Sequence, residues 1–144
     1  MEGKEEMSDQ TRIRVLCVDD HAMMREGITA IINHQPDMLV VAEAINGNEA
    51  IQKFREHQPD ITLMDLRLPD ICGIDASIAI RKEFADAKIL ILTTYKEDAE
   101  IQRAREAGAR GYLLKSLSPK TLVQAIRQVH AGSDWETGLT ADSQ

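Results

Sequence analysis

Aromatic side chains are scarce in this chain of 144 residues, which has one tryptophan, two tyrosines and two phenylalanines. The core is therefore expected to be aliphatic. The two cysteines, Cys17 and Cys72, show no CxxC or metal-ligand spacing, which favours free thiols in a reducing cytoplasm. No apolar run is long enough to cross a bilayer, and no N-terminal stretch has the pattern of a signal peptide. The sequence therefore predicts a cytoplasmic protein that does not contact a membrane.

Basic residues are also in short supply, because 17 Lys and Arg face 24 Asp and Glu and leave a net charge of −7. Contacts with phosphate backbones need clustered Lys and Arg, so the chain is not expected to bind nucleic acid by itself. An acidic balance instead suits a cation site or a basic partner. The length favours a single domain.

Short apolar runs rich in β-branched residues alternate with segments of helical periodicity along most of the chain. The runs are 13–18, 38–44, 61–64, 88–92 and 111–114. Five strands alternating with five helices predict an α/β fold in which helices cover both faces of a parallel sheet. We expect the doubly wound, flavodoxin-like strand order 2-1-3-4-5.

Both ends of the chain lack this pattern. Residues 1–11 are polar and predict a disordered tail, whereas residues 12–130 contain all the predicted elements. Residues 131–144 are small and polar apart from the lone Trp135, so they are interpreted as a linker or tail.

Charged or hydroxyl side chains follow four of the predicted strands. Asp19 and Asp20 end the first, Asp65 the third, Thr93 the fourth and Lys115 the fifth. Taken singly, such an Asp usually caps a helix or turn, and such a Lys is usually solvated. Parallel strands, however, bring their carboxyl ends to one edge of the sheet, where open α/β folds bind ligands. The coincidence of four such ends therefore predicts a functional site.

The residue types at this edge indicate metal-assisted phosphoryl chemistry. Three carboxylates would repel one another without a cation, and oxygen ligands without His or Cys favour Mg²⁺ or Mn²⁺. Asp65 stands alone at the central strand and is the candidate nucleophile that accepts a phosphoryl group. Lys115 would neutralise charge on the phosphoryl oxygens, and the Thr93 hydroxyl could donate a hydrogen bond to them.

These motifs resemble the receiver domain of bacterial two-component response regulators over residues 12–130. The stretches that carry the resemblance are the acidic pair DD (19–20), DLRLPDICG (65–73), LTTY (92–95) and GYLLK (111–115). The resemblance implies that Asp65 is the phosphoacceptor, served by a sensor histidine kinase, and that Thr93 and Tyr112 form the switch. It also implies that the metal is held by Asp19, Asp20, Asp65 and the backbone carbonyl of Arg67.

The stretches DDHAMMREGI and GARGYLLKSLSPKTLVQAI further resemble the NarL/FixJ type, whose members usually carry a C-terminal LuxR-type helix-turn-helix. The sequence contains no such domain, so DNA contact and transcriptional output are expected only through an output domain absent from this chain. Phosphorylation of Asp65 is expected to move the ring of Tyr112 from an exposed to a buried position and to create a partner surface, most simply for a homodimer.

Two other interpretations are left open. An Mg²⁺-dependent phosphatase or phosphotransferase would use similar aspartyl chemistry, although such enzymes carry a DxD pattern on the first strand, where this chain has DD. A stand-alone receiver acting through protein contacts is the second. His21 lies beside the two carboxylates but is expected to be solvated or to cap a helix.

Overall fold

In the computed structural model, residues 11–94 and 97–135 are described. Five parallel strands form one sheet in the order β2-β1-β3-β4-β5, as the sequence predicts. The strands are β1 (Ile13–Val18), β2 (Met38–Ala44), β3 (Ile61–Asp65), β4 (Ile89–Thr93) and β5 (Gly111–Leu114). The helices are α1 (Ala22–Asn33), α2 (Gly47–His57), α3 (Gly73–Glu83), α4 (Asp98–Glu106) and α5 (Pro119–His130).

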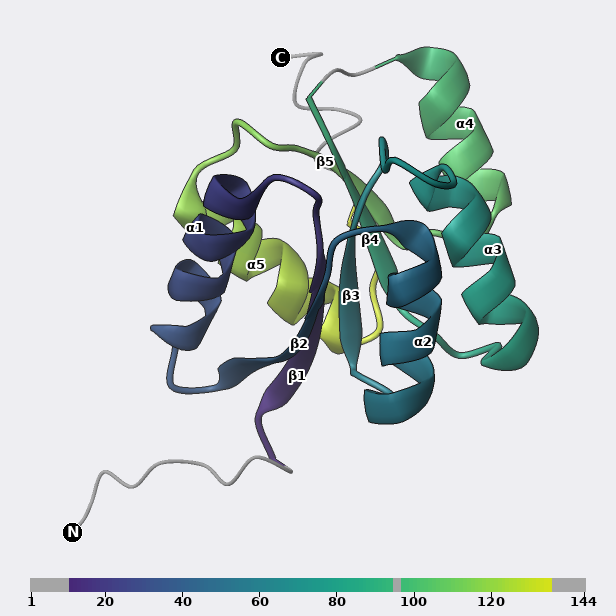
Figure 1. Ribbon diagram of the computed structural model, residues 1–144. Helices are drawn as coiled ribbons and strands as arrows, with labels where there is room; N and C mark the ends of the chain where they lie inside the picture. Colours follow the sequence, from purple (N-terminus) through teal and green to yellow (C-terminus); the bar gives the residue numbers. More distant parts are fainter. Residues whose placement is uncertain (1–10, 95–96, 136–144) are drawn as a thin grey trace, which may run out of the picture.

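The helices form two layers around the sheet (Figure 1). Helices α1 and α5 cover one face and enclose an aliphatic cluster that includes Ile28, Ile32 and Ile126. Helices α2, α3 and α4 cover the other face, where Phe54 and Ile80 belong to the second cluster. Both faces of the central strands are therefore buried, which explains their nearly continuous apolar sequence.

The ends of the strands decide where the polar residues lie. Strands β3 and β4 each extend one residue beyond the predicted apolar run, so Asp65 and Thr93 are their last residues. Both side chains are buried, and so is Asp19, which directly follows β1. The prediction that these residues share the carboxyl edge of the sheet is confirmed by the strand order and the parallel register.

Helix starts follow their local capping residues. Asn46 caps α2 through a hydrogen bond from the Glu49 N–H to its side chain, and Ser118 accepts from the Thr121 N–H at the start of α5. Pro119 occupies the first turn of α5, where its missing N–H costs no helical bond. Within the described residues, no helix combines the length and the hydropathy needed to span a membrane.

The structure shows a contact of Trp135 that the interpretation of residues 131–144 as a linker or tail did not include. Trp135 is only 7% exposed and packs into the cluster beneath α1 and α5. The backbone N–H of Trp135 donates to the Arg110 carbonyl at 2.8 Å, and the residue forms a parallel β-bridge with Gly111 at the start of β5. The apolar ring packs beside the edge strand β5. A single apolar residue in a polar stretch gives no sequence pattern that would predict this contact. The predictions for residues 1–10 and 136–144 lie outside the described residues.

Candidate functional site

Two carboxylates and one ammonium meet at the carboxyl edge of the sheet. The Lys115 Nζ lies 2.9 Å from Asp19 Oδ2 and 3.0 Å from Asp65 Oδ2. Both contacts are close enough for ion pairs, although neither has the angle of a good hydrogen bond. The side chains are 0%, 3% and 10% exposed for Asp19, Asp65 and Lys115, so water screens these charges poorly.

Burial and charge act in opposite directions on the pKa values of this cluster. Burial raises the pKa of Asp65, and the negative charge of Asp19 adds to that effect despite Lys115. Burial alone would also raise the pKa of Asp19, but the contact with Lys115 and the His21 N–H lower it below its usual value. Burial alone would lower the pKa of Lys115, yet the two carboxylates raise it, so the lysine stays charged.

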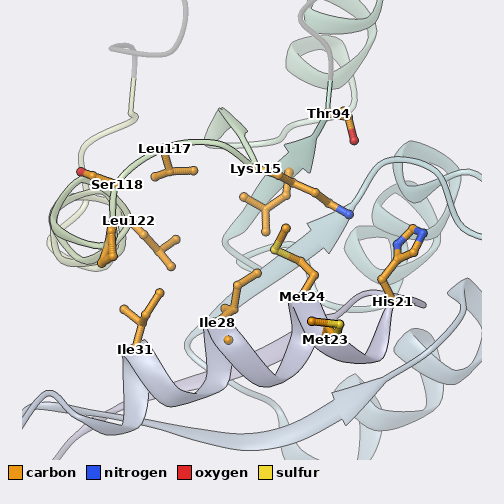
Figure 2. Close-up of a pocket in the computed structure, with 13 residues that line it drawn as sticks. His21, Met23, Met24, Ile28, Ile31, Thr94, Lys115, Leu117, Ser118 and Leu122 are labelled. Carbon is orange, nitrogen blue, oxygen red and sulfur yellow. The ribbon is translucent and has the colours of Figure 1, made fainter.

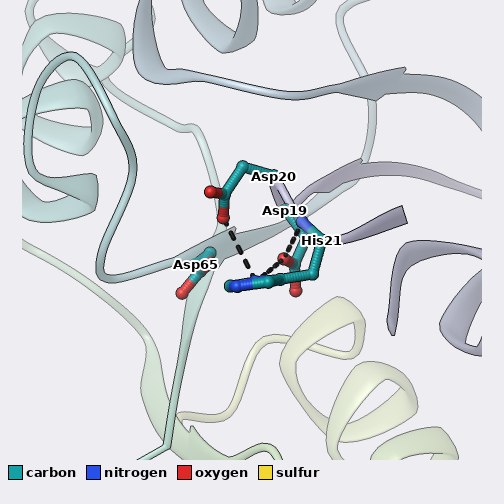
Figure 3. Close-up of side chains that lie close together, drawn as sticks. All are labelled: Asp19, Asp20, His21 and Asp65. Atoms are coloured by element: carbon teal, nitrogen blue, oxygen red, sulfur yellow. Dashed lines mark hydrogen bonds and ion pairs between the residues drawn. The ribbon is translucent and has the colours of Figure 1, made fainter. Parts of the chain in front are cut away.

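Asp20 and His21 are exposed and lie beside Asp19 and Asp65 (Figure 3). The His21 Nδ1 lies 3.1 Å from Asp19 Oδ1 and 3.2 Å from Asp20 Oδ1, and the His21 N–H donates to Asp19 Oδ1 at 2.9 Å. His21 occupies the N-cap position of α1, but its side chain is 68% exposed and makes no capping hydrogen bond, which agrees with the expected solvated role.

These residues could hold a metal ion. One possible ligand atom from each of Asp19, Asp20, His21 and Asp65 lies within 4.8 Å of the others. Three of these donors are carboxylates, of which two are buried, and such oxygen ligands suit a hard divalent cation. The nitrogen of His21 is a possible fourth ligand that sequence reasoning set aside, because its orientation toward the carboxylates has no signal in the sequence.

Thr93 and Tyr112 lie on the neighbouring strands β4 and β5, two residues apart in register. Their side chains share a hydrogen bond, and burial raises the pKa of the Tyr112 hydroxyl, with the charge of Glu100 as a further cause. Tyr112 is only 3% exposed. The expected starting position, with an exposed ring, is therefore not the one observed, because the hydroxyl already has Thr93 as a partner and the ring packs among the apolar residues of the α2–α4 face.

The loop between β3 and α3 begins directly after Asp65, the last residue of β3, and leads into α3 at Gly73. The Arg67 N–H donates to Asp65 Oδ1 at 3.2 Å, while its guanidinium forms an ion pair with Glu100 of α4 at 3.0 Å. The Gly73 N–H donates to the Leu66 carbonyl at 2.8 Å. A Cβ at Gly73 would collide with the Asp65 carbonyl oxygen, so this position requires glycine.

Two supporting residues escaped the sequence reasoning. The Arg25 guanidinium donates to the Asp19 carbonyl at 2.7 Å and to Glu43 at 2.9 Å, so it fixes the backbone after β1. Glu100 pairs with Arg67 from a different layer of the fold. Their partners lie 6, 18 and 33 residues away along the chain, and no short motif connects them.

An apolar groove of about 530 Å³ opens beside the cluster (Figure 2). His21, Thr94 and Lys115 lie at its polar end, and Met23 at its rim is 86% exposed. The rest of its wall comes from α1, from β4, from the segment that leads into α5 and from the first turn of that helix. These residues are Met24, Gly27, Ile28, Ile31, Leu92, Leu117, Ser118, Pro119 and Leu122.

Comparisons with known proteins agree with this arrangement. The response regulator receiver domain family matches residues 15–127. The response regulator protein VraR of Staphylococcus aureus is 43% identical over 120 residues, which are 83% of this chain and 57% of VraR. The chain thus spans little more than half the length of these curated relatives.

Solved structures give the same result. A LuxR-family two-component response regulator from Aurantimonas sp. SI85-9A1 is 45% identical, with a TM-score of 0.82 over 85% of this chain and 88% of the other. The signal receiver domain of a putative NarL from Mycobacterium tuberculosis is 30% identical, with a TM-score of 0.81 over 84% of this chain and 98% of the other. The chain therefore belongs to the response regulator receiver domain family of two-component signalling, and within it to the LuxR-related NarL/FixJ type.

Proposed function

We propose that the chain is a phosphorylation switch in which Asp65 accepts a phosphoryl group from a sensor histidine kinase. The observation that carries this proposal is the position of Asp65 at the end of the central strand. Its carboxylate lies 3.0 Å from the ammonium of Lys115 and belongs to the same acidic cluster as Asp19 and Asp20. A nucleophilic carboxylate beside a fixed ammonium is suited to phosphoryl transfer.

The charge of the cluster supports a role for Mg²⁺ or Mn²⁺. The carboxylates of Asp19, Asp20 and Asp65 against the single ammonium of Lys115 leave a net charge of −2 on these four side chains. A divalent cation balances that excess, and the three carboxylates with the Arg67 carbonyl would hold it. When bound, the cation supplies charge stabilisation on the transferring phosphoryl oxygens.

The chain's own residues carry the transfer. An oxygen of Asp65 attacks phosphorus while the N–P bond of the kinase phosphohistidine breaks, and the imidazole leaves with the electron pair of that bond. Lys115 remains beside the new phosphoryl group and offsets its negative charge. The Thr93 hydroxyl would exchange its bond with Tyr112 for one to a phosphoryl oxygen. Asp65 acts once per phosphorylation, as a switch and not as a turnover enzyme.

The apolar groove supports a protein as phosphodonor. Its polar end opens at Lys115 and His21, beside Asp65, so a partner seated on Met23 and Leu122 would reach the nucleophile. A histidine on an amphipathic helix has the chemistry to fill it, because the apolar face can bury against the groove while the phosphohistidine meets Lys115.

The output is proposed to run through the surface near Tyr112. Glu100 of α4 influences the Tyr112 hydroxyl and also binds Arg67, so a change at Asp65 can reach α4 through either residue. The expected consequence is a new contact surface, most simply for a homodimer. In the whole protein this surface would control transcription through a helix-turn-helix domain, which alone would contact DNA.

Phosphorylation by acetyl phosphate in the presence of Mg²⁺ tests the assignment, with intact mass as the measurement. Wild type is expected to gain one phosphoryl group and Asp65→Asn none. Asp60→Asn, which changes a carboxylate at the other end of β3, is the matched control and should react like wild type. An equal mass gain in Asp65→Asn would refute the nucleophile, and sustained turnover of a phosphate ester would identify an enzyme instead of a switch.

A further inference from the structure

Asp70 joins the loop that follows Asp65 to the start of a different helix. Its Oδ1 accepts the Gly47 N–H at 2.7 Å, and its Oδ2 accepts the Asn48 N–H at 2.8 Å. Oδ1 also accepts the N–H of its neighbour Ile71 at 2.7 Å. One carboxylate in the β3–α3 loop therefore binds two N–H groups in the first turn of α2 and one in its own loop.

The contact of Asp70 with α2 is favourable because the start of a helix has unpaired N–H groups. The first N–H groups of α2 have no partner within the helix, and the helix dipole favours a negative charge beside them. Asn46, the adjacent cap, satisfies only the Glu49 N–H through its side chain. Burial opposes the charge of Asp70, yet these N–H bonds lower the pKa of its carboxyl, so the residue is ionised at neutral pH.

The two segments approach each other too closely for a side chain at residue 47. A Cβ at Gly47 would collide with Cγ1 of Ile71 and would lie 3.3 Å from Asp70 Oδ1. Glycine at this position thus lets the loop rest directly on the backbone of the helix. The contact fixes the loop against a rigid element and does not depend on long, mobile side chains.

The loop held in this way adjoins one group of the proposed reaction, the Asp65 carboxylate, and contains a second. It begins after Asp65 and includes Arg67, whose backbone carbonyl is a proposed metal ligand. The bond from the Gly73 N–H to the Leu66 carbonyl closes the two ends of the loop on each other. Between those ends, the Arg67 guanidinium pairs with the side chain of Glu100, whereas Asp70 binds backbone.

We propose that Asp70 is a positioning residue for phosphoryl transfer, which fixes the loop on α2 so that the Arg67 carbonyl and the Asp65 carboxylate are set for metal binding. The inference rests on the proposed function. Mg²⁺ requires nearly ideal octahedral geometry, so a loop that shifts slightly loses affinity for it even when the fold remains intact. A residue that only caps α2 would affect stability and nothing else.

The neighbouring cap provides a matched control for that alternative. Asn46→Ala removes a side-chain bond from the same first turn of α2 but leaves the β3–α3 loop untouched. Asp70→Ala removes the bonds that join the loop to the helix. Asp70→Asn keeps one acceptor oxygen, so it is expected to fall between wild type and Asp70→Ala, and it remains informative if the alanine variant fails to fold.

The measurements are the free energy of unfolding, the Kd for Mg²⁺ by calorimetry and the rate of phosphorylation by acetyl phosphate at saturating Mg²⁺. Asp70→Ala is expected to raise the Kd about tenfold and to slow phosphorylation, as changes in residues that orient metal ligands do. Asn46→Ala should lower stability comparably and leave both quantities at the wild-type value. Equal effects of the two variants on the Kd would overturn the inference. Failure of wild type itself to bind Mg²⁺ or to gain a phosphoryl group would instead refute the proposed function.

Discussion

The two ends of the sheet differ in the burial and the balance of their charged side chains. At the carboxyl end, Asp19, Asp65 and Lys115 are buried together and their charges do not balance. At the amino end, a charged residue precedes every strand, and most of these side chains stay partly exposed. They are Arg12 before β1, Asp37 before β2, Asp60 before β3, Lys88 before β4 and Arg110 before β5.

Several amino-end residues bind a charged side chain or a backbone group of a neighbouring element. Asp37 binds Arg127 of α5 at 2.9 Å, and Asp60 accepts the Arg14 N–H at 2.9 Å. The Lys88 ammonium donates to the carbonyl at the end of α5, at His130, over 3.1 Å. These contacts hold helices and loops to the sheet. The cluster at the other end instead carries an excess of negative charge, which agrees with the proposed cation site.

Of the paired substitutions at the two ends, replacing Lys115 and Lys88 should give the largest difference in the free energy of unfolding. Lys115→Met leaves Asp19 and Asp65 as buried carboxylates without a cation, so without metal we expect a loss of about 3 kcal/mol in the free energy of unfolding. Lys88→Met removes one exposed bond and should cost less than about 1 kcal/mol. Denaturant titration at pH 7 measures both.

A second substitution identifies the cause of the loss. Adding Asp65→Asn to Lys115→Met should restore part of the lost stability, because it removes one of the two uncompensated charges. Equal losses for the two lysine variants, or additive effects in the double variant, would contradict the view that the carboxyl end is electrostatically strained.

Neutralising the aspartate at each end of β3 should give effects of opposite sign. Without metal, Asp65→Asn is expected to stabilise the fold at pH 7, because it removes a buried charge that lies close to the charge of Asp19. Asp60→Asn weakens the bond from the Arg14 N–H and should destabilise slightly.

The pH dependence follows from the raised pKa of Asp65. The folded state takes up a proton on this carboxyl more readily than the unfolded state. The contribution of Asp65 to the free energy of unfolding is therefore greatest at pH values below its usual pKa of 3.8, and it declines as the pH rises through the folded pKa. The advantage of Asp65→Asn should thus be absent near pH 3 and complete at pH 7. Denaturant titrations across that range would show the opposite trend if the Asp65 pKa were lowered.

The smallest effect is expected at the exposed pair of the amino end. The hydrogen bond from Arg127 lowers the pKa of Asp37 despite partial burial, so its contribution is present at neutral pH and is lost as pH falls through the folded pKa. Arg127→Gln should cost less than about 1 kcal/mol and the difference should shrink in high salt. A cost equal to that of Lys115→Met would erase the distinction between the two ends.

The sequence predicted the fold and the residues of the carboxyl edge because both depend on local signals. Apolar runs define the strands, and parallel strands end at one edge of the sheet. The sequence alone therefore predicted that Asp19, Asp65 and Lys115 lie close together. Asp70 was visible only as part of a motif, since its partners at Gly47 and Asn48 precede it by 23 and 22 residues.

Side-chain states and isolated contacts could not be predicted in this way. The buried position of the Tyr112 ring depends on packing against α4 and on the hydroxyl of Thr93, and neither has a periodic signal. Trp135 was assigned to a linker because one apolar residue among polar neighbours makes no pattern. Its place in the core depends on an open strand edge at Gly111 that only the assembled sheet provides.

Strand β5 connects the site to the place where Trp135 is docked. Lys115 follows one end of this strand, whereas Gly111 at its other end pairs with Trp135, four residues or about 13 Å away. Because an extended strand hardly stretches, a displacement of β5 along its own axis alters both contacts together. The strand thus joins the ammonium that contacts Asp65 at one end to the docked segment beyond α5 at the other.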